Sequence, residues 1–271
     1  MWVSKGLSNQ RNLTLAMPSI TIRWLTANVA RILDEAAVSH ILFGWMAVSL
    51  VGKDFGFQEI DFVVPDSNLQ LATGALMKAG FPLCNNPYCS ELEPCRNKNT
   101  RNHEERMAKN QHHPVAACHF HIMKPGQALV SLHKESKLLW WLPHYTASDD
   151  DLWLSTDPRL HLGTFPWLEL YPIKLLNPKW LVKAVLTLLC RDGGQPRTGW
   201  EMWYSMAQCL VELEKLASGK GIPYFQPELK PACDILSAPG RVPEHAVLLL
   251  RQMYDQTLTG KEPGRNNNLC A

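Results

Sequence analysis

A glycine turn in this chain is followed by a strand with two alternating acids. Residues 39–50 predict a short buried strand, a turn at Gly44 and the start of a helix. Residues 57–64 predict a second strand. Glu59 and Asp61 point to one of its faces, and the apolar Ile60 and Phe62 point to the other. This order of elements predicts a sheet with helices packed around it.

Periodicity predicts the remaining elements. Apolar residues recur at helical spacing over residues 20–36, 177–191, 199–217 and 243–257. Asp66 is a candidate cap for a further helix after the acid-bearing strand. Residues 115–123 and 128–141 predict a hairpin, and residues 143–176 predict irregular, aromatic-rich structure.

The predicted fold class is α+β, a mixed sheet flanked by helices and followed by a helical C-terminal half. The predicted segments are a loose N-terminus (1–19), an α/β domain (20–142) with a loop insertion (84–114), an aromatic-rich cap and helical domain (143–258) and a tail (259–271).

Composition gives no support for a membrane or nucleic-acid partner. The net charge of +2 gives no argument for nucleic acid or an anionic membrane as a partner. No stretch approaches the roughly 20 apolar residues of a membrane span, and the first residues lack the apolar core of a secretory signal. We therefore expect a soluble, cytoplasmic protein whose eight cysteines are reduced. The sequence does not determine an oligomeric state.

At Gly44 and Glu59-Ile60-Asp61 the chain resembles the nucleotidyltransferase fold, in particular its small-molecule and minimal-type members, which include many fungal proteins. The family pattern is a strand, a small-residue turn opening a helix, a strand with two alternating acids, and a third acid on a later strand. The resemblance covers roughly residues 20–142. It implies a nucleotidyltransferase-like domain in which Glu59 and Asp61 hold Mg²⁺ beside a nucleoside triphosphate.

Three departures from the family pattern indicate a degenerate active site. Trp45 stands where the pattern has a small residue, and Glu59 stands for Asp. The strand predicted to supply the third acid carries His119 and His121 instead. Histidine is a poor ligand for Mg²⁺. We expect these histidines to face Glu59 and Asp61, where the four groups could transfer protons or hold Zn²⁺.

The favoured hypothesis is a repurposed nucleotidyltransferase-fold protein. It binds an apolar small molecule and catalyses a cofactor-independent cyclisation or isomerisation in specialised metabolism. The candidate catalytic residues are Asp61, Glu59, His119 and His121, and the candidate substrate-binding residues are Gly44, Trp45, Trp140 and Trp203. One alternative is an active nucleotidyltransferase that uses Mg²⁺ and a nucleoside triphosphate on a small molecule or RNA. Another is a non-catalytic pseudo-enzyme.

A second zinc hypothesis concerns the insertion. It contains three cysteines and three histidines, namely Cys84, Cys89, Cys95, His103, His112 and His113. Their spacing lacks a C-x₂-C knuckle, so the sequence favours a loop insertion over a zinc site there.

Overall fold

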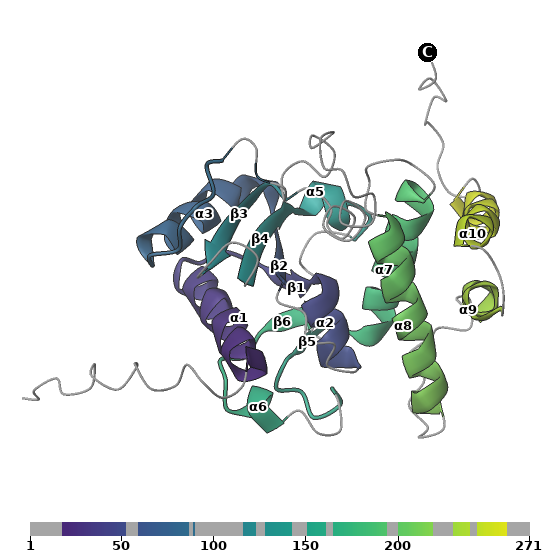
Figure 1. Ribbon diagram of the computed structural model, residues 1–271, viewed down its shortest axis with the longest axis horizontal. Coiled ribbons are helices and arrows are strands. Elements are labelled where there is room, and N and C mark those ends of the chain that lie inside the picture. Colours follow the sequence, from purple (N-terminus) through teal and green to yellow (C-terminus); the bar gives the residue numbers. More distant parts are fainter. Residues whose placement is uncertain are drawn as a thin grey trace, which may run out of the picture.

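The structure is a computed structural model, shown in Figure 1. It describes residues 18–52, 59–86, 89, 116–122, 128–142, 151–160, 165–193, 200–218, 230–238 and 243–258. The elements are α1 (Pro18–Glu35), β1 (Ile41–Phe43), α2 (Gly44–Val51), β2 (Glu59–Val64), the 3₁₀ turn η1 (Asp66–Asn68), α3 (Leu69–Lys78), β3 (Cys118–Ile122), β4 (Ala128–Lys134), α5 (Glu135–Leu138), β5 (Leu152–Leu154), α6 (Phe165–Leu168), β6 (Lys174–Leu176), α7 (Pro178–Asp192), α8 (Trp200–Ser218), α9 (Lys230–Ser237) and α10 (Pro243–Leu258). The predicted N-terminal segment 1–19, the insertion 84–114 and the tail 259–271 lie largely outside the described residues.

Six strands form one mixed sheet in the order β3-β4-β2-β1-β6-β5. β2 pairs antiparallel with β1 and parallel with β4, and β6 pairs parallel with β1. β3 pairs antiparallel with β4, which confirms the predicted hairpin. The fold class is therefore α+β, as the sequence predicts.

The register assigns each side chain to a face, because paired residues on neighbouring strands point the same way. Asp61 pairs with Ser131, and Ser131 pairs with His119. The site face, as we name it, carries Glu59 and Asp61 of β2, Leu129, Ser131 and His133 of β4, and His119 and His121 of β3. The opposite face packs against α3, where Thr73 Oγ1 lies 3.2 Å from Cys118 Sγ.

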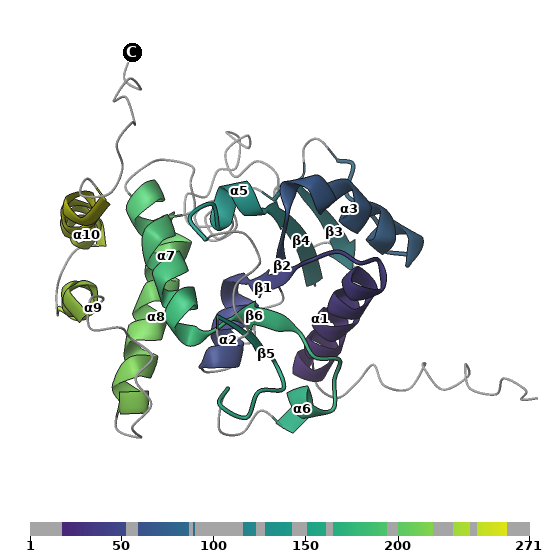
Figure 2. The same cartoon turned by 180° about the vertical axis from the view of Figure 1, so that it is seen from behind.

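The helical half packs beyond the β1 side of the sheet, with α9 and α10 outermost in both views (Figures 1 and 2). The Asn177 side chain accepts a hydrogen bond from Trp180 N–H and so caps α7. Trp203 of α8 is completely buried, and its ring meets Phe43 edge to face. This contact ties α8 to the strand that precedes Gly44. Of the described helices, none is long and apolar enough to cross a membrane.

Three local predictions are wrong. The second strand of the hairpin is predicted to reach residue 141, but β4 ends at Lys134 and α5 follows it directly. Residues 143–176 are not irregular throughout, because β5 and β6 lie within them and extend the sheet beyond β1. Asp66 does not cap the helix that follows it. Its carboxylate instead accepts hydrogen bonds from Ser136 N–H and Oγ–H, at 3.0 and 2.7 Å, and joins the end of β2 to α5.

A buried histidine beside α1 makes stability depend on pH. His40 is 1% exposed, and burial lowers its pKa despite its hydrogen bond to the Val38 carbonyl and the nearby Asp34. Because the folded pKa lies below the unfolded value, the stabilisation is complete above the ordinary histidine pKa of about 6.5. It is lost as the pH falls toward the folded pKa.

We therefore expect His40→Asn to weaken the pH dependence of stability. Asparagine keeps a donor for the Val38 carbonyl but does not titrate. Urea unfolding of both proteins, above and below the ordinary histidine pKa, measures the difference. Equal pH dependence in the two proteins would contradict the assignment of a neutral, buried His40.

Candidate functional site

The turn at Gly44 lies against the second acid of β2. Phe43 pairs with Asp61 across the antiparallel strands, and Gly44 has φ +68°. A Cβ at residue 44 would lie 2.2 Å from Asp61 Oδ2, a distance that no side chain tolerates. A glycine is therefore required at residue 44 for two reasons: the left-handed backbone conformation and the close approach of the Asp61 carboxylate.

The Asp61 carboxylate is paired with a histidine that is absent from the candidate residues predicted from the sequence. His133 Nε2 lies 3.2 Å from Asp61 Oδ1. Both residues are almost fully buried, at 3% and 4% exposure. A carboxylate can only accept, so the His133 ring donates to Asp61 through Nε2–H. The sequence pattern missed this pair because it favoured β3, rather than β4, as the neighbour of β2.

The carboxylates present do not fit the three-acid set of the nucleotidyltransferase pattern. The strand beside β2 contributes Leu129, Ser131 and His133 to the site face. Mg²⁺ prefers hard oxygen ligands in octahedral geometry. Glu59 and Asp61 are the carboxylates that the strands of the site face supply, and Asp61 is already bonded to His133. The described residues of the site face therefore lack the third carboxylate that this pattern places beside a metal-bound triphosphate.

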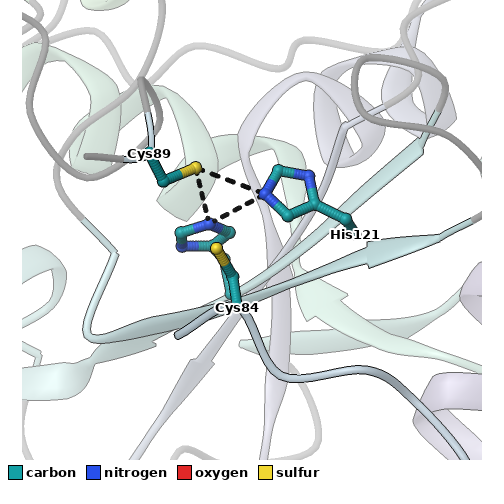
Figure 3. Close-up of side chains that lie close together, drawn as sticks. Cys84, Cys89 and His121 are labelled. Atoms are coloured by element: carbon teal, nitrogen blue, oxygen red, sulfur yellow. Dashed lines mark hydrogen bonds between the residues drawn. The ribbon is translucent and has the colours of Figure 1, made fainter. Parts of the chain in front are cut away.

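His119 and His121 share the site face with the two acids but contact different partners. Both Nε2 atoms lie 3.3 Å from Cys89 Sγ and 3.2 Å from each other (Figure 3). Burial, together with the nearby His121, lowers the pKa of His119 to about 4, so its imidazole is neutral at pH 7. β4 lies between these histidines and β2. The predicted cluster of two acids with two histidines is thus replaced by two separate groups.

The three candidate tryptophans occupy different environments. Trp45 is 6% exposed and belongs to the apolar core, and Trp203 is completely buried. Trp203 Nε1–H donates to Asp192 Oδ2 at 3.0 Å. Trp140 is 39% exposed, with the Arg191 guanidinium 4.7 Å from its ring centre. Trp45 and Trp203 could contact a ligand only after repacking, so their role in substrate binding stays a prediction.

No family model matches the chain, and no curated protein sequence is significantly similar to it. Solved structures of nucleotidyltransferase type are similar over most of its length. An antigenic nucleotidyltransferase-like protein from Paracoccidioides brasiliensis has 12% identity and a TM-score of 0.43, over 89% of this chain and 90% of that one. The antibiotic-resistance factor ANT(2″)-Ia in solution has 8% identity and a TM-score of 0.40, over 90% of this chain and 96% of that one.

ANT(2″)-Ia in complex with adenylyl-2″-tobramycin has 10% identity and a TM-score of 0.42, over 86% of this chain and 99% of that one. TM-scores of this size indicate only partial correspondence of the backbones, so they carry no conclusion about activity.

Proposed function

We propose that this protein binds an apolar small molecule on the site face of its sheet and acts on it by acid–base catalysis, without transferring a nucleotide. The observation that supports this most is the Asp61–His133 pair, at 3.2 Å. It stands on β2 and β4, where the family pattern would have carboxylates for metal. An imidazole oriented by a carboxylate is a common general base.

The pair suggests a proton relay within one substrate molecule. Asp61 fixes the tautomer of His133 and would stabilise the imidazolium formed when Nδ1 takes a proton from the substrate. Returning that proton to another atom completes an isomerisation or a ring closure and leaves the composition of the substrate unchanged. Such a step consumes neither a nucleotide nor a redox cofactor. It agrees with the cyclisation or isomerisation that the sequence hypothesis places in specialised metabolism.

The burial of Asp61 and His133 determines how a ligand would reach them. Both side chains are less than 5% exposed, so a ligand reaches them only by displacing neighbouring groups. Binding would then require that the groups covering Asp61 and His133 move aside. The apparent affinity of the ligand is reduced in proportion to the fraction of molecules in this open state. In return, the reacting groups are shielded from water, which strengthens their electrostatic interactions.

Thermal shift tests the proposal. We expect none of the four nucleoside triphosphates, with Mg²⁺ or Mn²⁺, to raise the Tm. We expect apolar carbonyl-bearing fragments to raise it, because a ligand at 100 times its Kd stabilises the native state by about 2.7 kcal/mol. For a chain of this size, each kcal/mol corresponds to roughly 2–4 °C. The fragment shift should decrease in His133→Gln and Asp61→Asn.

Two outcomes would overturn the proposal. Stabilisation by a triphosphate with Mg²⁺ that is lost in Asp61→Asn would establish the nucleotidyltransferase alternative. Fragment shifts that are equal in wild type, His133→Gln and Asp61→Asn would show that ligands bind elsewhere, and would leave the Asp61–His133 pair a structural element of a pseudo-enzyme.

A further inference from the structure

We propose that Cys84, Cys89, His119 and His121 bind a structural Zn²⁺ ion. The ligand atoms of these four side chains all lie within 4.8 Å of one another. Figure 3 shows both sulfurs and the His121 ring turned toward one point. Neither the resemblance to nucleotidyltransferases nor the proposed acid–base chemistry requires this cluster.

Backbone hydrogen bonds bring the four residues together. His119 and His121 are two residues apart on β3, so both point to the site face. Leu83 forms an antiparallel bridge with Phe120, and Cys84 N–H donates to the His119 carbonyl at 3.0 Å. Cys89 N–H donates to the Asn86 carbonyl at 3.0 Å, which places Cys89 near the same segment.

The distances suit a tetrahedral zinc ion. Bonds of about 2.3 Å to sulfur and 2.0–2.1 Å to nitrogen place the two nitrogens roughly 3.3 Å apart, and each nitrogen roughly 3.5 Å from each sulfur. The observed Nε2–Nε2 distance is 3.2 Å, and both nitrogens lie 3.3 Å from Cys89 Sγ. These three atoms are therefore within a few tenths of an ångström of the expected geometry, and Cys84 Sγ lies within 4.8 Å of each of them.

Hydrogen bonds alone do not explain the short contacts among Cys89 Sγ and the two Nε2 atoms. A ring nitrogen that carries a proton has no lone pair left to accept with, so the three mutual contacts cannot all be good hydrogen bonds. Among the described residues, Nδ1 of both histidines is buried without a hydrogen-bond partner. One cation at the centre would accept a lone pair from every ligand atom at once.

The ligand types select the metal and its role. Thiolates and imidazoles favour Zn²⁺ over the hard Mg²⁺ of nucleotidyl transfer. Two thiolates and two neutral imidazoles around Zn²⁺ have no net charge, which lowers the cost of burying the complex. Four protein ligands leave no open position for substrate, which is typical of a structural site.

The position explains what the ion would stabilise. β3 is an edge strand of the sheet, and Leu83 and Cys84 pair with its outer side. Two strand spacings, or about 10 Å, separate the backbone of His119 from that of Asp61. The ion would fasten Cys84 and Cys89 to β3, and through β3 it would support β4, the strand that carries His133.

Metal analysis of the intact chain tests the site. We expect one Zn²⁺ per chain in protein purified without chelator, falling to background in the double variant Cys84→Ser/Cys89→Ser. Cys118→Ser is the matched control, because Cys118 lies on the same strand but points to the opposite face, toward Thr73. It should retain a full equivalent of zinc.

The wild-type chain gives an independent readout that does not depend on a variant folding. Co²⁺ added to chelated protein should produce the strong visible bands of a tetrahedral site and a sulfur-to-cobalt charge-transfer band. Chelation should lower the Tm, and Zn²⁺ but not Mg²⁺ should restore it. Absence of zinc together with absence of the cobalt bands, or a Cys84–Cys89 disulfide in the purified protein, would overturn the proposal. Zinc lost equally in Cys118→Ser would also overturn it.

Discussion

Trp203→Ala is expected to lower the free energy of unfolding by about 3–5 kcal/mol. The side chain is completely buried between the helical half and the sheet, with its ring centre 6.1 Å from that of Phe43. The substitution opens a cavity and also removes the Nε1–H donor of Asp192, a carboxylate that is only 5% exposed. Urea unfolding followed by far-ultraviolet circular dichroism measures the loss.

Two further variants separate the contributions of Trp203. Trp203→Phe keeps a ring against Phe43 but removes the donor, so its cost should approach that of a hydrogen bond to a charged group, about 1.5–3 kcal/mol. Trp24→Ala removes the same side chain from a site that is 55% exposed and should stay within roughly 0.5 kcal/mol of wild type. Equal losses in Trp203→Ala and Trp24→Ala would show that Trp203 does not join the two halves.

The elements that the sequence predicts best are those with many pattern repeats. The long helices α1, α7, α8 and α10 show apolar residues at helical spacing over several turns. β5 and β6 have three residues each, too few for an alternating pattern. They therefore fall within a region predicted to be irregular, although β6 pairs with β1.

The strand order explains the main error at the candidate site. The hairpin of β3 and β4 is visible in the sequence, but its pattern does not say which strand lies inside the sheet. β4 takes the inner place beside β2, so His133 rather than His121 meets Asp61. His133 lies on the face of Ser131 by strand alternation. Strand alternation in the sequence therefore identifies His133 as a site-face residue, provided that β4 is known to be the strand beside β2.

The Cys/His cluster could not be predicted from spacing along the chain alone. Cys89 and His121 are separated by 32 positions, and only the pairing of residue 83 with β3 brings them together. Cys84 and Cys89 have four residues between them rather than the two of a C-x₂-C knuckle, a spacing that zinc sites also use. The other candidate ligands of the insertion, Cys95 and its three histidines, lie outside the described residues.

Gly44→Ala is the second substitution with a large expected effect. Its φ of +68° costs an alanine about 1–2 kcal/mol. The new Cβ would also push the Asp61 carboxylate away from His133, and leaving buried polar groups unpaired costs about 1–3 kcal/mol more. We expect the free energy of unfolding to fall by the sum, about 2–5 kcal/mol, in urea titrations.

Two glycines of the same chain separate backbone strain from contact. Gly80 has φ +92°, and a Cβ added there would have nothing within 4 Å, so Gly80→Ala should show the conformational cost alone. Gly74 lies in α3 with open space around it, and Gly74→Ala should stabilise the protein by about 0.5–1 kcal/mol. The excess cost of Gly44→Ala over Gly80→Ala then measures the contact with Asp61.

A double-mutant cycle tests that contact directly. In an Asp61→Ala background the carboxylate is gone, so adding Gly44→Ala should cost little more than Gly80→Ala does. The two substitutions should therefore be coupled, since residues in direct contact show interaction energies of about 0.5–3 kcal/mol. Additive effects would mean that Gly44 does not hold Asp61 in place. The glycine turn would then be needed for its backbone alone, and the Asp61–His133 pair would owe its position to the sheet register.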